Sequence, residues 1–148
     1  SQCSKDLFLR FGLEGLKKRN PQDLSGGEKQ RLALCVALGK EADYYFLDEP
    51  TKGMDAKSKK LFGELLKEWT KMEKSIVMVS HDMEFTAKYA DEISLLYQGE
   101  IIVQCPVREF MEENQFYTTG MNRVTRRVNP HIITIEDVKK YAKRKNSQ

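Results

Sequence analysis

Two short runs of residues carry side chains suited to phosphate chemistry. The first, 24–31, reads Leu-Ser-Gly-Gly-Glu-Lys-Gln-Arg, and the second, 44–50, reads Tyr-Tyr-Phe-Leu-Asp-Glu-Pro. The first run offers a hydroxyl and two glycines at the predicted start of a helix, where free backbone N–H groups and the helix dipole favour a phosphate oxygen. The second ends an apolar stretch in Asp48 and Glu49, carboxylates that can orient Mg²⁺ and polarise water.

The first run also has a purely structural interpretation. Ser25 followed three residues later by Glu28 is a capping box, which satisfies backbone donors at the start of many helices. However, glycine destabilises a helix interior by roughly 1 kcal/mol relative to alanine, so a structural helix has little reason to begin with Gly26 and Gly27. Glycines at this place let a ligand approach the backbone, which favours phosphate binding.

The acidic pair and a histidine have ordinary alternatives as well. Asp48 and Glu49 could form a simple turn, and a lone histidine such as His81 is more often a packed or surface residue than a catalytic one. Both follow apolar runs, at the carboxyl edge where open α/β sheets bind ligands, and this position favours the chemical interpretation. Asp55 can cap the helix that follows it.

The runs between these residues predict an α/β fold. The continuous apolar stretches 44–47 and 75–79 indicate strands buried on both faces of a parallel sheet. Between them, apolar residues recur at three- and four-residue steps, which predicts a helix and hence a strand, helix, strand unit. The predicted helix over 25–39 is apolar nearly all round in its second half, so we expect it to be buried.

The remaining predicted elements surround this unit. They are a short helix and turn over 6–16, a hairpin of strands 93–97 and 101–104, and helices over 107–113 and 136–145. The hairpin is indicated by the Gln-Gly-Glu turn between two apolar runs.

Composition fits a soluble globular domain. The 148 residues are 40% apolar, yet no run approaches the roughly 20 apolar residues of a membrane span. Three widely spaced cysteines, Cys3, Cys35 and Cys105, indicate reduced cytosolic thiols. The net charge of +3 is uneven, because the part from Asn114 onward carries eight Lys and Arg against two acidic residues. This basic tail indicates a solvated surface, or contact with an acidic partner or anionic headgroups.

Taken together, the two runs resemble the signature and the Walker B strand of ATP-binding cassette (ABC) ATPases. The resemblance covers about residues 7–104 and adds a D-loop at 51–55 and a switch histidine at His81, in the order and spacing of that family. The sequence lacks the G-x-x-x-x-G-K-[ST] phosphate loop (Walker A) and the Q-loop. The resemblance therefore implies a truncated P-loop NTPase fold, the C-terminal portion of an ATPase domain with a parallel sheet, flanking helices and a small C-terminal extension.

The resemblance implies a role for each motif in binding ATP and Mg²⁺. Asp48 would orient Mg²⁺ through water, Glu49 would position and polarise the attacking water, and His81 would contact the γ-phosphate. Asp55 would belong to a D-loop that touches its counterpart across a dimer. The signature would contact ATP held by the opposing domain, through Ser25, Gly26, Gly27, Glu28 and Gln30.

A segment beyond the hairpin narrows the resemblance. Residues 114–119, with Asn122 and Arg123 shortly after, are similar to a segment in the ATPase subunits of energy-coupling-factor importers, which take up vitamins or metal ions. The D-loop sequence Lys-Gly-Met-Asp also favours the transporter branch. The implied partners are a second ABC ATPase domain, in a homodimer, a heterodimer or a fused chain, and transmembrane transporter subunits.

In this interpretation the protein works in the cytoplasm, peripherally on the inner face of the cell membrane, and binds no nucleic acid. Two alternatives stay open: an ABC ATPase without a transport role, in repair or translation, and a non-hydrolysing assembly subunit.

Two parts of the chain are predicted, 1–105 as the ATPase portion and 106–148 as a helical, basic extension. Without a phosphate loop, the isolated chain is expected not to hydrolyse ATP. In the family fold, the strand that leads into the phosphate loop lies beside 75–79. We therefore expect this chain either to self-associate or to pair strand 93–97 with 75–79.

Overall fold

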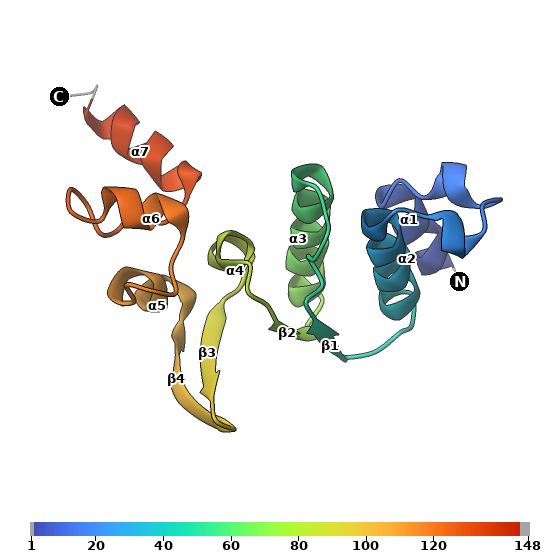
Figure 1. Ribbon diagram of the computed structural model, residues 1–148, viewed down its shortest axis with the longest axis horizontal. Helices are drawn as coiled ribbons and strands as arrows, with labels where there is room; N and C mark the ends of the chain where they lie inside the picture. The colour runs from blue at the N-terminus through green and yellow to red at the C-terminus, as the bar shows by residue number, and fades with distance from the viewer. Residues whose placement is uncertain (1, 146–148) are drawn as a thin grey trace. The chain divides into compact units, whose positions relative to one another are not determined.

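The computed structural model describes residues 2–145, which form two compact units (Figure 1). The first unit ends at His81 and the second begins at Asp82. Both combine helices with strands, so the predicted α/β class is confirmed. The predicted division into 1–105 and 106–148 follows the motifs and stays a prediction.

The first unit contains the predicted strand, helix, strand arrangement. Its elements are α1 (Gln2–Arg10), the 3-10 helices η1 (Glu14–Leu16) and η2 (Pro21–Asp23), α2 (Gly26–Leu38), β1 (Tyr44–Asp48), α3 (Ala56–Lys71) and β2 (Ser75–Val79). β1 and β2 are parallel, with Tyr44 opposite Ser75 and Asp48 opposite Val79. Asp55 caps α3 as predicted, because its Oδ1 accepts the Ser58 N–H at 2.7 Å.

The expectation that both strands are buried on two faces is wrong. Tyr45 is buried on one face of β1, where its ring lies 4.8 Å from that of Trp69 in α3. Along the other face, no described element covers the apolar side chains. These are Tyr44, Phe46, Val77 and Val79, with exposed fractions of 69%, 78%, 54% and 61%. The expected self-association stays a prediction, and an apolar face of this kind favours it.

The helices at the start of the chain also differ from expectation. α1 ends at Arg10, and Gly12 then takes a left-handed conformation with φ of 65°. α2 buries Leu34, Cys35 and Leu38 but leaves Val36 60% exposed, so it is buried along one face only. The second half of α2 is apolar on all sides, and the described neighbours of the helix cover only one of them.

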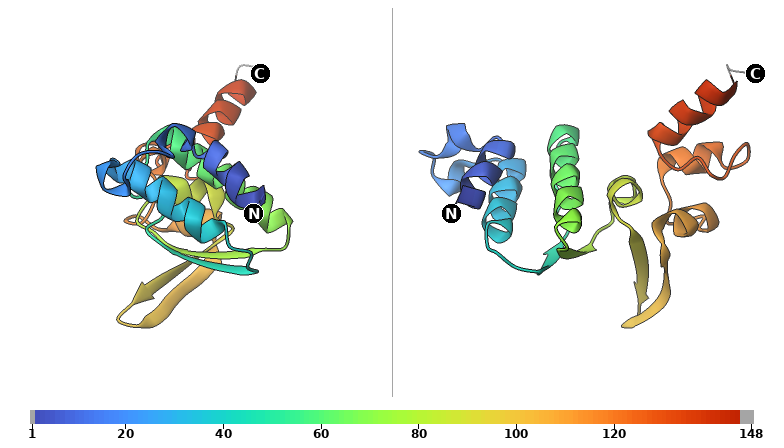
Figure 2. Two further views of the ribbon diagram at one scale, coloured as in Figure 1. Left: turned by 90° about the vertical axis from the view of Figure 1, so that its right-hand side faces the viewer. Right: turned by 180° about the vertical axis from the view of Figure 1, so that it is seen from behind.

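The second unit is a hairpin with helices packed at its base. Its elements are α4 (Met83–Tyr89), β3 (Glu92–Tyr97), β4 (Glu100–Pro106), α5 (Val107–Glu113), α6 (Gly120–Thr125) and α7 (Ile135–Lys145). Figure 2 shows β3 and β4 side by side as the predicted antiparallel hairpin. Gln98 and Gly99 turn the chain with φ of 50° and 86°, as a type I′ turn requires. The expected pairing of 93–97 with 75–79 would join the two units and stays a prediction.

A buried polar network holds the segment after α5. Asn122 is fully buried, and its Nδ2 donates to the carbonyl oxygens of Pro130 at 2.8 Å and Ile132 at 3.2 Å. Its Oδ1 accepts the Thr118 hydroxyl at 3.2 Å, and Thr119 Oγ1 donates to the Ile133 carbonyl. The hydrogen bonds of the side-chain amide thus join α6 to the loop before α7. The segment that resembles energy-coupling-factor ATPases therefore has a structural role.

This network predicts a large loss of stability when Asn122 is replaced. Asn122→Ala should lower the free energy of unfolding by about 2–4 kcal/mol, because it removes three hydrogen bonds of a buried side-chain amide and opens a small cavity. Urea unfolding of the full chain, followed by far-UV circular dichroism, measures this change. Gln115→Ala, at an exposed position nearby, serves as the control. A loss equal to that of the control would contradict the network's role.

Candidate functional site

The start of α2 combines a cap with an open backbone. Ser25 Oγ accepts the Glu28 N–H at 3.3 Å, and Glu28 Oε2 accepts the Ser25 N–H at 2.8 Å, so the capping box is complete. The hydrogen bond from the Ser25 backbone holds the pKa of the Glu28 carboxyl below its usual range. The structural interpretation of this pair is therefore correct. It leaves phosphate binding open, because Ser25 and Gly26 are exposed.

The two glycines of α2 have different surroundings. A Cβ on Gly26 would meet nothing within 4 Å, so its backbone is open to a ligand. A Cβ on Gly27 would lie 2.8 Å from the Gly53 carbonyl oxygen, which is closer than any real contact. The predicted close approach to Gly27 is thus made by the chain's own 51–55 loop, and only Gly26 keeps the room that ligand binding needs.

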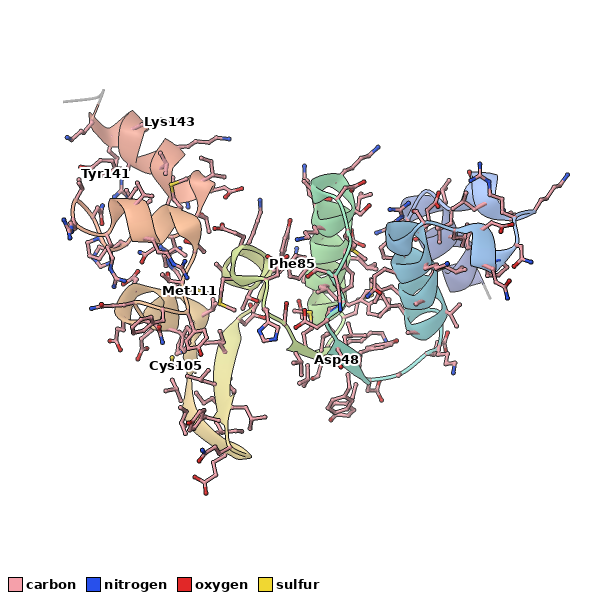
Figure 3. All side chains as sticks on the ribbon, viewed as in Figure 1. Asp48, Phe85, Cys105, Met111, Tyr141 and Lys143 are labelled. Atoms are coloured by element: carbon pink, nitrogen blue, oxygen red, sulfur yellow. The ribbon has the colours of Figure 1, made fainter. Side chains whose placement is uncertain are left out.

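The acidic pair lies at the end of β1. Asp48 is the last residue of the strand and is exposed (Figure 3). Glu49 follows with φ of 44°, a left-handed conformation that costs a non-glycine residue on the order of 1–3 kcal/mol. The Glu49 N–H donates to the Val79 carbonyl at 2.8 Å and so extends the pairing of β1 and β2 by one bond. This bond helps to hold the strained backbone in place.

Glu49 and His81 come together at this edge of the sheet. Glu49 Oε1 lies 3.5 Å from His81 Nε2. The His81 side chain is 94% exposed, whereas Glu49 Oε1 is enclosed and makes no hydrogen bond with any described residue. Buried carboxylate oxygens are normally hydrogen-bonded, so this oxygen is an acceptor that a bound group could satisfy.

Glu49 and His81 are 32 positions apart in the sequence. The parallel pairing of β1 and β2 brings them together, because both strands end at the same edge.

Side chains of α2 bind the turn that carries Glu49. Gln30 Nε2 donates to the carbonyl oxygens of Glu49 at 3.3 Å and Pro50 at 3.1 Å. At the next residue of α2, Arg31 Nη1 donates to Ser58 Oγ at 3.3 Å. The sequence interpretation missed these contacts, because a glutamine two residues after the capping glutamate carries no signal of where its amide points.

Asp55 acts within its own chain. Its carboxylate accepts the Ser58 N–H, and this backbone hydrogen bond keeps the pKa of Asp55 below its usual range. The capping role is therefore present, while the predicted contact across a dimer stays a prediction.

The residues at this edge fit Mg²⁺ only together with a nucleotide. Within residues 2–145, no group of three or more His, Cys, Asp or Glu side chains converges as a metal site made by protein alone would require. Mg²⁺ in nucleotide sites is held by one or two carboxylates with water and phosphate oxygens. Asp48, exposed at the end of β1, can provide such a carboxylate.

Comparisons with known proteins agree with this arrangement. The sequence family described as ABC transporter matches residues 2–52. A putative ABC transporter ATP-binding protein of Bacillus thuringiensis subsp. konkukian is 46% identical over 137 residues, which are 93% of this chain and 25% of that protein. One from Clostridium tetani is 37% identical over 120 residues, 81% of this chain and 28% of that protein. This chain belongs to the ABC transporter ATPases.

Two solved structures share the ABC ATPase fold. One is cbiO1 from Clostridium perfringens, part of the ABC transporter complex cbiONQ, with a TM-score of 0.61 and 26% identity over 87% of this chain and 50% of that one. The other is the archaeal ribosome recycling factor aABCE1, in complex with the ribosomal stalk protein aP1, with a TM-score of 0.62 and 27% identity over 76% of this chain and 23% of that one. The P-loop NTPase fold is thereby confirmed.

The chain spans about a quarter of the length of the Bacillus and Clostridium relatives. None of the helices within residues 2–145 has the length and apolar character needed to cross a membrane.

The two signature glycines should respond differently to alanine. Gly27→Ala should lower the free energy of unfolding by about 1–3 kcal/mol, because its Cβ collides with the Gly53 carbonyl. Gly26→Ala should be neutral or slightly stabilising, because its Cβ meets open space and alanine favours the helix. Thermal unfolding of the two variants beside the parent chain measures the difference. Equal losses in both would show that the close contact with Gly53 is absent in solution.

Proposed function

We propose that this chain is part of an ATP-binding subunit that powers an ABC importer of the energy-coupling-factor type by ATP hydrolysis. The observation that carries the proposal is the meeting of Glu49 and His81 beside Asp48, at the edge where β1 and β2 end. Carboxylates and a histidine at this place can serve a phosphoryl transfer, in which positioning and charge stabilisation do most of the work.

Each residue at the edge has a proposed task. Asp48 would hold Mg²⁺ through water, and Glu49 would accept a proton from the attacking water as general base. His81 contacts the γ-phosphate and, at 3.5 Å, lies close enough to Glu49 to orient its carboxylate. When bound, the nucleotide would supply the γ-phosphate as the electrophile, and Mg²⁺ would neutralise part of its negative charge.

The signature is proposed to serve a nucleotide held by an opposing ABC ATPase domain. Ser25 and Gly26 are the exposed part of the α2 start, so an opposing surface can reach them. The free N–H groups there favour a phosphate oxygen through the helix dipole. The two domains would then enclose ATP between them. Alone, the chain is expected to be inactive, because its sequence has no phosphate loop.

Two observations support the importer over other ABC ATPases. The Bacillus and Clostridium relatives carry names of transporter ATP-binding proteins. The structure of cbiO1, part of a transporter complex, matches 87% of this chain. Transmembrane transporter subunits are thus the proposed partners, and the proposed location is the cytoplasmic face of the membrane. The imported compound, a vitamin or metal ion in that class of transporter, follows from the resemblance alone.

A second candidate is a role in translation, favoured by the likeness to the ribosome recycling factor aABCE1. Co-purification of the full-length protein with membrane subunits supports the importer. Co-sedimentation with ribosomes supports the second candidate.

In the full-length protein, Glu49→Gln should slow ATP hydrolysis by about 10²- to 10⁴-fold, because it removes the general base. Nucleotide affinity should stay the same, since the substitution keeps the shape of the side chain. Steady-state phosphate release and calorimetric titration with MgATP measure the two effects. Glu41→Gln, an exposed control, should change neither. An unchanged turnover number for Glu49→Gln would place the general base elsewhere.

Ser25→Arg in the full-length protein should abolish turnover but leave ATP binding at the same subunit's phosphate loop intact. The bulky cation blocks the start of α2, which in this proposal serves the opposite site. Nucleotide titration and turnover of the variant test this, with Ser94→Arg on exposed β3 as control. If Ser25→Arg weakens nucleotide binding in its own subunit as much as turnover, the assignment to the opposite site is wrong.

A further inference from the structure

The Gln30 side chain faces the catalytic turn of its own chain. It is half-buried, and both its hydrogen bonds go to backbone carbonyls, those of Glu49 and Pro50. A glutamine amide has two N–H donors, which matches two carbonyl acceptors. We propose that Gln30 is a positioning residue for Glu49, and this inference rests on the proposed function of Glu49 as general base.

The backbone of Glu49 needs such support. Its left-handed conformation is one that a residue with a side chain keeps only when its surroundings enforce it. The N–H of Glu49 is held by the Val79 carbonyl, at 2.8 Å. Its carbonyl oxygen is held by the Lys52 N–H at 3.1 Å and by Gln30. Of these three contacts, only that of Gln30 is made by a side chain, and this side chain comes from α2.

Two further contacts make α2 a firm base for this support. The Gly27 backbone packs against the Gly53 carbonyl, and Arg31 donates to Ser58. α2 thus touches the segment after β1 at three places along one face. A displacement of the α2 start, where the signature lies, is transmitted through Gln30 to the carbonyl of Glu49.

Two substitutions of Gln30 distinguish the effect of its N–H donors from the effect of its side-chain volume. Gln30→Met keeps the length of the side chain but has no N–H, whereas Gln30→Lys keeps a donor. In the full-length protein, Gln30→Met should lower kcat by about tenfold or more while KM for ATP changes less than about twofold. Gln30→Lys should retain kcat within about threefold. Gln22→Met, at an exposed position, is the matched control.

The double variant with Glu49→Gln tests positioning directly. If Gln30 acts through Glu49, Gln30→Met should cause no further loss once the carboxylate is gone. Full additivity would overturn the proposal. A rise in KM without a fall in kcat would overturn it too, in favour of direct contact between Gln30 and nucleotide, as would an unchanged kcat.

Amide hydrogen exchange of the 148-residue chain gives a readout without activity. Gln30→Met should speed exchange at the Glu49 and Lys52 amides by about tenfold relative to Gln22→Met, with the amides inside β1 unchanged. Unchanged exchange at both amides would overturn the positioning contact. If the full-length protein does not hydrolyse ATP, the proposed function fails, and the exchange experiment still decides whether Gln30 holds the turn.

Discussion

The parallel register of β1 and β2 is the constraint on which the candidate site depends. With Asp48 opposite Val79, both strands end at one edge, and the Glu49 N–H reaches the Val79 carbonyl. His81 then emerges beside Glu49. A slip of one residue would turn every side chain of the strand to the other face and separate Glu49 from His81. Packing of Tyr45 against Trp69 opposes such a slip, because it fixes which face of β1 meets α3.

Both units have apolar cores, and the second adds a buried polar network. The first buries apolar side chains of α1, α2 and α3, such as Leu7, Leu38 and Phe62, but leaves Phe46 and Val36 exposed. The second buries a polar side chain, Asn122, and satisfies both ends of its amide. A fully satisfied buried amide fixes a single arrangement of the loops it joins, whereas apolar contacts tolerate several.

The sequence predicted much of this structure. Strong local signals, such as the capping box at Ser25, the Asp55 cap and the Gln98-Gly99 turn, fixed element boundaries to within a few residues. Burial was predicted poorly, because periodicity reports how apolar a strand is and not whether a neighbour covers it. The contacts of Gln30 and Gly27 join segments distant in sequence, so no local pattern could reveal them.

The left-handed backbone at Glu49 lowers the stability of the fold at a residue that the proposed activity needs. Glycine adopts this conformation without steric penalty, so the folded chain alone would favour glycine at this position. A selection for thermal stability that ignored ATP turnover would therefore favour replacing Glu49 by glycine. Substitutions that stabilise this turn should therefore be made at the residues that contact it. Glu49 itself should be kept.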